Sequence, residues 1–285
     1  MCRHFAYLGP PTVLSALLLA PAHGLYRQSW APRQQSHGTV NADGFGLGWY
    51  PLDGDGLPAR YRRAVPIWAD PNLPDLARSL RSGAVLAAVR DATPGTSPDE
   101  SANAPFSEGP WLFSHNGAVP DWRQLTQDSG VSLPAPVLLG LAAQSDSALL
   151  WLLLHDRLRS GEPPGTALAE VTRLAAAARP RARLNLLLTD GHRIAATRWG
   201  DSLWYRAAAG AVTVASEPWD DEPRHGEPRD REPRHGEPRD HPHPDAGGWQ
   251  EVPEHSLLLA TPTSVRTTPL SPVVPRPVAE RIAYP

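Results

Sequence analysis

The stretch MCRHFAYLG (residues 1–9) contains the only cysteine of the chain, Cys2, directly after the initiator methionine. A cysteine kept for packing belongs on an apolar strand or helix, where a free thiol behaves as a small buried hydrophobic group. Position 2 allows another interpretation, in which Met1 is removed and Cys2 becomes the first residue. It would then carry a thiol and an α-amine together. The rest of the sequence has to decide between these two interpretations.

Composition excludes several classes of function. The 285 residues are enough for one large domain or two ordinary ones. The net charge of -3 carries no polycationic signature, so we expect no nucleic-acid partner. All 27 basic residues are arginine, which excludes a Schiff-base lysine and a phosphate-loop lysine. A single cysteine excludes an internal disulfide and a multi-cysteine zinc site.

The run VLSALLLAPA (13–22) is the segment that comes nearest to a targeting signal. It is shorter than the ~20 apolar residues that span a bilayer, so we expect no membrane partner. Arg3 is the only firm charge before it, and Pro10 and Pro11 interrupt the approach. Cleavage within the run would also remove Cys2. We therefore predict an amphipathic helix in this run and a cytoplasmic location.

Secondary-structure patterns predict a layered α+β fold. Two adjacent helices are predicted at 145–161, with Ser145 as the cap and Gly161 at the end, and at 164–180, which Pro180 stops. Asp190-Gly191 is a hairpin signal. Strand clusters on both sides of a helical pair favour layered α+β over βαβ alternation. The predicted strands are apolar segments bounded by turn residues, at 84–90, 111–117, 182–190, 192–199, 202–208, 211–216 and 256–262.

A tandem repeat separates two of these strands. EPRHGEPRDR (222–231) is followed by EPRHGEPRDH (232–241), with no apolar residue to bury and frequent prolines. Such a segment cannot offset its ordering entropy, so we predict a disordered surface insertion at 219–248. Its histidines could chelate a metal adventitiously, but we favour a tolerated loop expansion and assign the repeat no role. A proline-rich tail is predicted at 269–285.

Cys2 needs a base and an oxyanion site if it is a nucleophile. A terminal α-amine has a pKa near ~8 and can accept the thiol proton in place of a histidine. Asn116-Gly117 in FSHNGAV follows a predicted strand, and an Asn amide beside a Gly N–H makes a compact pair of donors. An ordinary Asn-Gly turn is the alternative.

Two charged residues could hold an α-amino acid head group. Arg90 in AAVRDATPGT ends an apolar strand, which suits a bidentate carboxylate clamp, although a surface arginine packed along its stem is the alternative. Asp146 begins the helix at 145–161 and could bind an ammonium group. The helix dipole alone would also favour an acid there.

The segment NADGFGLGWY (41–50) has glycines in G-x-G spacing. It lacks the strand–helix context of a dinucleotide loop and the third glycine of that motif, so we predict no nucleotide site. We expect these glycines to allow close packing near the N-terminal strand. Asp43 and Glu217 stay candidates by position alone.

Taken in order, these motifs resemble those of the class II glutamine amidotransferase family. The likeness rests on Cys2 in MCRH, Arg90 in VRDATPG, Asn116-Gly117 in HNG and Asp146 in SDS, and it covers most of 2–217. Within that family, MCRHFAYLG, LLLAPAHGLYRQSWAPR, HGTVNADGFGLGWY and VASEPW look most like the ergothioneine-pathway hydrolases. Those enzymes remove the γ-glutamyl group from γ-glutamyl-hercynylcysteine sulfoxide.

The resemblance implies a fold and a set of roles. The fold would be a four-layer αββα N-terminal-nucleophile sandwich, one domain over 2–268, with no metal or organic cofactor. Pro94 stands where glutamine-using synthases often have histidine, which weakens the case for glutamine as the substrate. The implied roles are Cys2 as nucleophile with its α-amine as base, Asn116 and Gly117 as oxyanion hole, Arg90 for the α-carboxylate, Asp146 for the α-ammonium, and Thr93 in the pocket wall.

The expected activity is hydrolysis of a small-molecule γ-glutamyl amide through a thioester on Cys2. One alternative is a glutaminase subunit that supplies ammonia to a separate synthase. Another is a non-catalytic scaffold, which retention of Met1 would favour. The residues that hold the non-glutamyl half are not identified, and a homodimer is left open.

Overall fold

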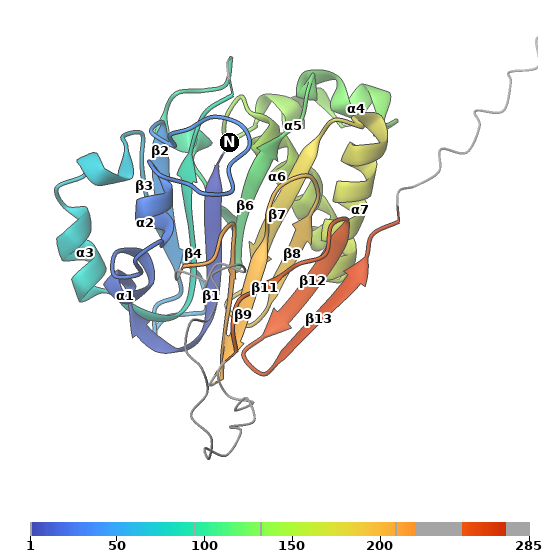
Figure 1. Ribbon diagram of the computed structural model, residues 1–285. Helices are drawn as coiled ribbons and strands as arrows, with labels where there is room; N and C mark the ends of the chain where they lie inside the picture. Colours follow the sequence, from blue (N-terminus) through green and yellow to red (C-terminus); the bar gives the residue numbers. More distant parts are fainter. Residues whose placement is uncertain (1, 94, 132, 209, 220–246, 272–285) are drawn as a thin grey trace, which may run out of the picture.

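Two antiparallel β-sheets pack face to face in the structure, which is a computed structural model (Figure 1). It describes residues 2–93, 95–131, 133–208, 210–219 and 247–271. The first sheet has the order β11-β9-β10-β1-β4-β2-β3 and contains β1 (Arg3–Val13), β2 (Gly44–Trp49), β3 (Ala59–Arg63), β4 (Arg81–Arg90), β9 (Trp204–Ala208), β10 (Ala211–Ala215) and β11 (Gln250–Glu251). The second has the order β13-β12-β8-β7-β6-β5 and contains β5 (Phe106–Glu108), β6 (Trp111–Ala118), β7 (Arg183–Thr189), β8 (Ile194–Arg198), β12 (Ser256–Thr261) and β13 (Ser264–Pro269).

Helices cover the outer face of each sheet (Figure 1). Those on the first sheet are α1 (Leu14–Leu18), α2 (Leu25–Gln28) and α3 (Leu73–Ser79), and those on the second are α6 (Asp146–Arg159) and α7 (Pro164–Ala178). The shorter elements are α4 (Leu125–Asp128), α5 (Ala135–Leu139) and the 3-10 turns η1 (Ile67–Ala69), η2 (Glu100–Ala102) and η3 (Trp122–Gln124). Within the described ranges, no helix is long and apolar enough to cross a bilayer.

Three hydrophobic clusters fill the spaces between these layers. Strand β1 contributes side chains to two of these clusters, because alternate side chains of a strand point to opposite faces of the sheet. Phe5 and Tyr7 pack under the helices of the first sheet, and Ala6 and Leu8 pack between the sheets. A third cluster joins the second sheet to α6 and α7. The four-layer αββα order is therefore confirmed.

The predicted elements are present. The predicted strands correspond to β4, β6, β7, β8, β9, β10 and β12, and the predicted helical pair to α6 and α7. The hydroxyl of Ser145 accepts a hydrogen bond from the Ala148 N–H at 3.2 Å and caps α6. In the run 13–22 only Leu14–Leu18 is helical, as α1.

Strand β2 explains the glycine spacing in 41–50. Gly46 and Gly48 face the second sheet on the same side of the strand. A Cβ atom on Gly46 would lie 2.2 Å from the Ala104 carbonyl oxygen, and one on Gly48 would lie 2.7 Å from a Leu112 methyl. These glycines therefore allow close approach of the two sheets, and the segment is a strand of the first sheet.

Two tryptophans mark where the repeat segment leaves and rejoins the described structure. Trp219 and Trp249 are both buried, and their rings lie 5.7 Å apart. Trp219 also packs edge-on against Phe5 of β1. The rest of the predicted insertion, 220–246, lies outside the described residues, as does 272–285 of the predicted tail. Leu270, directly after β13, is buried.

Candidate active site

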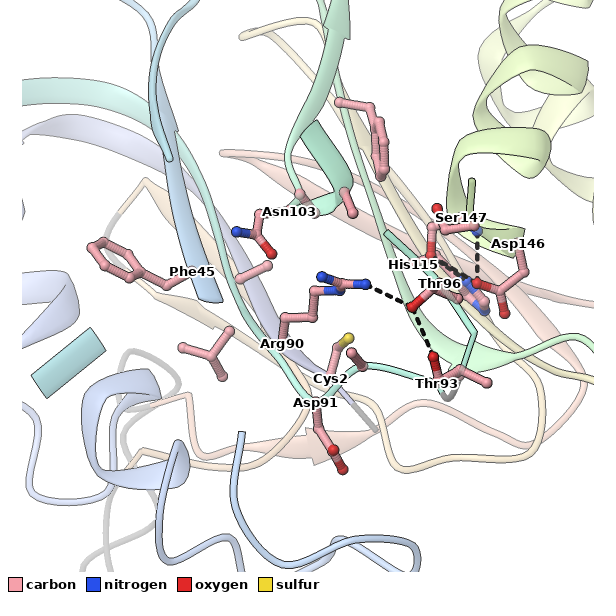
Figure 2. A pocket seen from close by; sticks show the side chains of 18 residues that line it. Cys2, Phe45, Arg90, Asp91, Thr93, Thr96, Asn103, His115, Asp146 and Ser147 are labelled. Atoms are coloured by element: carbon pink, nitrogen blue, oxygen red, sulfur yellow. Dashed lines mark hydrogen bonds between the residues drawn. The ribbon is translucent and has the colours of Figure 1, made fainter. Parts of the chain in front are cut away.

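Strand pairing places Cys2 beside Arg90 at one edge of the first sheet. Arg3 pairs with Val89, so the residue before Arg3 lies opposite Arg90, and Gly44 pairs with Arg90 from the other side. A cavity opens at this edge (Figure 2). All but one of the predicted site residues line it, namely Cys2, Arg90, Thr93, Gly117 and Asp146. Cys2, directly before β1, thus meets residues from β4, β6 and α6 at one place.

The Cys2 thiol is half-buried in the wall of this cavity. Burial raises the pKa of the thiol above its ordinary value. The backbone N–H of Asp91, which bonds to the sulfur, and the charge of Arg90 act in the opposite direction and do not overcome burial. The neutral thiol is therefore the resting form at neutral pH, and a nucleophilic attack requires a base.

Arg90 offers one half of its guanidinium to the cavity. The side chain is buried, and its Nη2 donates to the Thr96 hydroxyl and to the Ser97 carbonyl oxygen, both at 2.8 Å. Its Nη1 is buried without a hydrogen-bond partner. A buried donor without a partner is costly unless a ligand completes it. The surface-arginine alternative is therefore wrong.

The loop after β4 is held by its own hydrogen bonds. The Thr93 carbonyl oxygen accepts from the Thr96 hydroxyl at 2.7 Å and from the Thr96 N–H at 3.2 Å. Asp43 supports the same loop, since its carboxylate accepts from the Ala92 N–H at 2.7 Å. Asp43 therefore fixes the loop that carries Thr93, and it is not among the described residues that line the cavity. Pro94 lies outside the described residues.

Asp146 presents a buried carboxylate on the far wall of the cavity. One oxygen accepts from the Val119 N–H at 2.9 Å, and the other accepts from the Ser147 N–H at 2.8 Å. Ser145 caps α6, so Asp146 is not needed as the cap. Each carboxylate oxygen keeps a lone pair that a cationic ligand can use.

Gly117 and Asn116 occupy neighbouring positions near the end of β6. Gly117 has φ 151°, and a Cβ atom there would lie 2.0 Å from the Arg183 carbonyl oxygen, so only glycine fits. Asn116 is fully buried, and neither polar atom of its side chain has a partner. It is the one predicted site residue that is not among those described as lining the cavity.

The register between the two sheets places Asn116 at the level of Cys2. His4 of β1 reaches Ser114 of β6 across the gap, with 3.0 Å between Nδ1 and the hydroxyl. Cys2 lies two residues before His4, and Asn116 lies two residues after Ser114. The start of β1 and the end of β6 meet at the same cavity, so the two strands run in opposite directions there. Cys2 and Asn116 therefore extend from facing strands at the same level.

Several polar residues that line the cavity were not predicted as site residues, among them His115, Ser147 and Asn103. His115 holds Ser147, because its Nε2 donates to the Arg183 carbonyl oxygen at 2.9 Å, which leaves Nδ1 to accept from the Ser147 hydroxyl at 3.0 Å. His115 lies in the motif HNG and Ser147 in the motif SDS, and this position within predicted motifs is the sequence feature that could have identified them as site residues. Asn103 donates from Nδ2 to the Arg63 carbonyl oxygen at 2.8 Å and keeps its Oδ1 without a partner. In the view of Figure 2, Arg90 lies between Asn103 on one side and Thr96 and Asp146 on the other.

In the part of the chain that the structure describes, no group of three or more His, Cys, Asp and Glu side chains is placed to hold a metal ion.

Comparison with known proteins supplies relatives along almost the whole chain. The chain is 41% identical over 271 residues to the gamma-glutamyl-hercynylcysteine sulfoxide hydrolase of Mycolicibacterium smegmatis, covering 95% of this chain and 100% of that protein. The protein of the same name from Mycobacterium tuberculosis (strain CDC 1551) is 43% identical over 272 residues, covering 95% of this chain and 97% of that protein.

A solved structure, that of a class II glutamine aminotransferase domain protein from Silicibacter pomeroyi, superposes with a TM-score of 0.61 at 23% identity. It covers 95% of this chain and 100% of that one, and it shows the same fold. Residues 23–210 match the family described as glutamine amidotransferases class-II. With the four-layer fold and relatives of this identity along its length, the chain belongs to the class II glutamine amidotransferase family.

Proposed function

We propose that the chain hydrolyses the γ-glutamyl amide of γ-glutamyl-hercynylcysteine sulfoxide to glutamate and hercynylcysteine sulfoxide. The two mycobacterial relatives support this substrate by their names. Each relative shares more than two fifths of its residues with the chain over nearly the whole length of the chain. The observation that carries the proposal is the buried, unpartnered Nη1 of Arg90 in the same cavity as Cys2 and the Asp146 carboxylate.

That cavity suits the head group of a γ-glutamyl substrate. The α-carboxylate would pair with Arg90 Nη1, and the α-ammonium would pair with Asp146, each through a charge-assisted hydrogen bond. Thr93 would form part of the wall between them. With both ends of the head group held, the side-chain carbonyl reaches Cys2. Such positioning can lower a barrier by several kcal/mol, with ~7 kcal/mol and more in favourable intramolecular cases.

The first chemical step would form a thioester. After removal of Met1, the Cys2 α-amine takes the thiol proton, and the sulfur attacks the γ-carbonyl carbon. The carbonyl oxygen becomes an oxyanion, which Asn116 Nδ2 and the Gly117 N–H stabilise. The intermediate then collapses: the C–N bond breaks, and the Cys2 ammonium returns its proton to the departing amine.

The second step would release glutamate. A water molecule gives a proton to the Cys2 α-amine and attacks the thioester carbon. The same donors hold the second oxyanion, the C–S bond breaks, and the thiol is restored.

The test is glutamate release from γ-glutamyl-hercynylcysteine sulfoxide and from glutamine, measured side by side with Met1-processed protein. We expect a strong preference in kcat/KM for the sulfoxide. Preference for glutamine, with activation by a separate synthase, would replace the proposal with the glutaminase-subunit alternative. No glutamate release from either substrate would contradict it.

A further inference from the structure

We propose that residues 31–40, between α2 and β2, form the wall against which the leaving amine of the substrate lies, and that Glu217 is the positioning residue that holds this wall. The proposal rests on the proposed hydrolase function and deepens it. It assigns selectivity for a bulky amine over ammonia to a segment outside the glutamyl cavity. We call residues 31–40 the covering loop.

The covering loop crosses the open edge of both sheets next to the nucleophile. On the first sheet, Gln34 accepts a hydrogen bond from Trp204 Nε1 of β9 at 2.8 Å. Further along, a Cβ atom on Gly38 would lie 2.1 Å from an Asp91 carboxylate oxygen, so the loop passes directly beside the residue whose N–H bonds to the Cys2 sulfur.

The loop also reaches the second sheet. Asp201 follows β8, and its burial raises the pKa of its carboxyl group. His37 is one of the groups close enough to oppose that rise, together with Arg183 and Arg3. The covering loop therefore lies beside Trp204 and Asp91, and its His37 is near enough to the Asp201 carboxylate to act on it electrostatically.

The position of the glutamyl cavity determines on which side of Cys2 the leaving amine lies. The head-group cavity is lined by Cys2 and Phe45, and by residues from β4, the loop after β4, the segment 102–106, β6 and the start of α6, and none of its described lining residues belongs to 31–40. A scissile bond at the Cys2 sulfur has the glutamyl group on one side and the amine on the other. With the glutamyl side occupied by these elements, the amine extends toward the covering loop.

Glu217 fastens the covering loop to the strand that carries the nucleophile. One carboxylate oxygen accepts from the Arg33 N–H and from His23 Nε2, both at 2.8 Å. The other accepts from the Gln34 N–H at 3.0 Å and lies 3.2 Å from Arg3 Nε. Arg3 and Glu217 are both fully buried, and Arg3 directly follows Cys2.

Only a carboxylate can make this set of contacts. Two backbone N–H groups, an imidazole and a guanidinium all approach the two oxygens of one side chain. A glutamine at 217 would replace one acceptor oxygen by an NH₂ group, which faces these donors without bonding to them. The covering loop would then lose an anchor while Cys2 and the glutamyl cavity keep their own contacts.

The experiment compares Glu217→Gln and Gln34→Ala with the control Gln250→Ala. Gln250 accepts from the Tyr205 hydroxyl at 2.6 Å on the same sheet, so its replacement removes a matched hydrogen bond away from the covering loop. Each variant is assayed for kcat/KM on γ-glutamyl-hercynylcysteine sulfoxide. Each is also assayed for the rate at which the diazoketone analogue of glutamine labels Cys2, because that probe fills the glutamyl cavity and carries no leaving amine.

We expect the ratio of hydrolysis to labelling to fall by at least about tenfold in Glu217→Gln and Gln34→Ala, mostly through KM, and to stay at the wild-type value in Gln250→Ala. An unchanged ratio in Gln34→Ala, which leaves the buried Arg3 pair intact, would overturn the inference even if Glu217→Gln folds poorly. So would an equal loss of hydrolysis and labelling. A wild-type protein that is labelled but releases no glutamate would contradict the proposed function itself.

Discussion

Two residues on which the proposed chemistry depends carry buried polar atoms without hydrogen-bond partners. Arg90 Nη1 and both polar atoms of the Asn116 side chain are buried and unbonded. Each such group costs roughly 1–3 kcal/mol of folding free energy relative to a satisfied one. A substrate carboxylate would satisfy Arg90 Nη1, and a developing oxyanion would satisfy Asn116 Nδ2. The cost in the free protein is thus consistent with sites prepared for a ligand and a transition state.

Asn116→Leu tests the effect of Asn116 on catalysis separately from its effect on stability. We expect kcat to fall by about 10²–10³-fold with little change in KM, because an oxyanion donor acts in the transition state. We also expect the free energy of unfolding to stay the same or rise, since the asparagine makes no hydrogen bond that the leucine would lose. Steady-state kinetics and denaturant unfolding measure the two effects. A large loss of stability with retained kcat would contradict the oxyanion role.

Arg90→Met tests the carboxylate clamp. We expect kcat/KM to fall by roughly 10–100-fold, mainly through KM, because a charge-assisted hydrogen bond to the α-carboxylate is lost. Thr96→Val is the control, since it removes one support of Arg90 and leaves the guanidinium in place. The clamp role fails if Arg90→Met changes kcat alone, or if Thr96→Val has the larger effect.

At the scale of the element, β2 shows a strand whose sequence is set by its neighbours. Its inward positions are glycines because residues 104 and 112 approach them closely. We expect Gly46→Ala to destabilise the protein by about 1–3 kcal/mol, as overpacking of a tight interface does. In Gly140→Ala the new Cβ meets its nearest neighbour at 3.4 Å, so that variant should unfold near the wild-type midpoint. Equal midpoints in urea for the two variants would contradict this account.

The same element shows where prediction from the sequence stops. Strand β7 and the capped helix α6 carry their pattern locally, in a run of apolar residues and in Ser145, and both were predicted. Strand β2 alternates glycine with Phe45, Leu47 and Trp49, but glycine is depleted in strands, so this segment was not predicted as a strand, and only the structure shows its pairing with β3 and β4.

The candidate site divides in a similar way. Cys2, Arg90 and Gly117 lie in short motifs and could be proposed from the sequence. Asn103 could not be, because its role depends on its hydrogen bond to Arg63, forty positions earlier in the chain.

At the scale of the whole molecule, the buried pair of Arg3 and Glu217 ties the start of the chain to the end of the first sheet. Burial alone would raise the pKa of Glu217, but the hydrogen bond from His23, the charge of Arg3 and the N–H groups of Arg33 and Gln34 outweigh it and hold the pKa below the ordinary value of 4.5. The unfolded chain therefore binds a proton on Glu217 more readily than the folded chain does.

This difference predicts an acid-sensitive contribution to stability. The contribution of Glu217 is fully present above the unfolded pKa and is lost as the pH falls through the lower, folded pKa. We expect the difference in unfolding free energy between the wild type and Glu217→Gln to be largest at neutral pH and to shrink steadily below about pH 4.5. A difference that stays constant down to pH ~3 would show that the charge of Glu217 contributes nothing.

The proposed function requires that Cys2, exposed as the first residue, carries the reaction. The most direct measurement is glutamate release from γ-glutamyl-hercynylcysteine sulfoxide by Met1-processed wild type and by Cys2→Ala, with matched unfolding curves to show that both are folded. We predict turnover by the wild type and none above background by Cys2→Ala. Substantial glutamate release by folded Cys2→Ala would contradict the account.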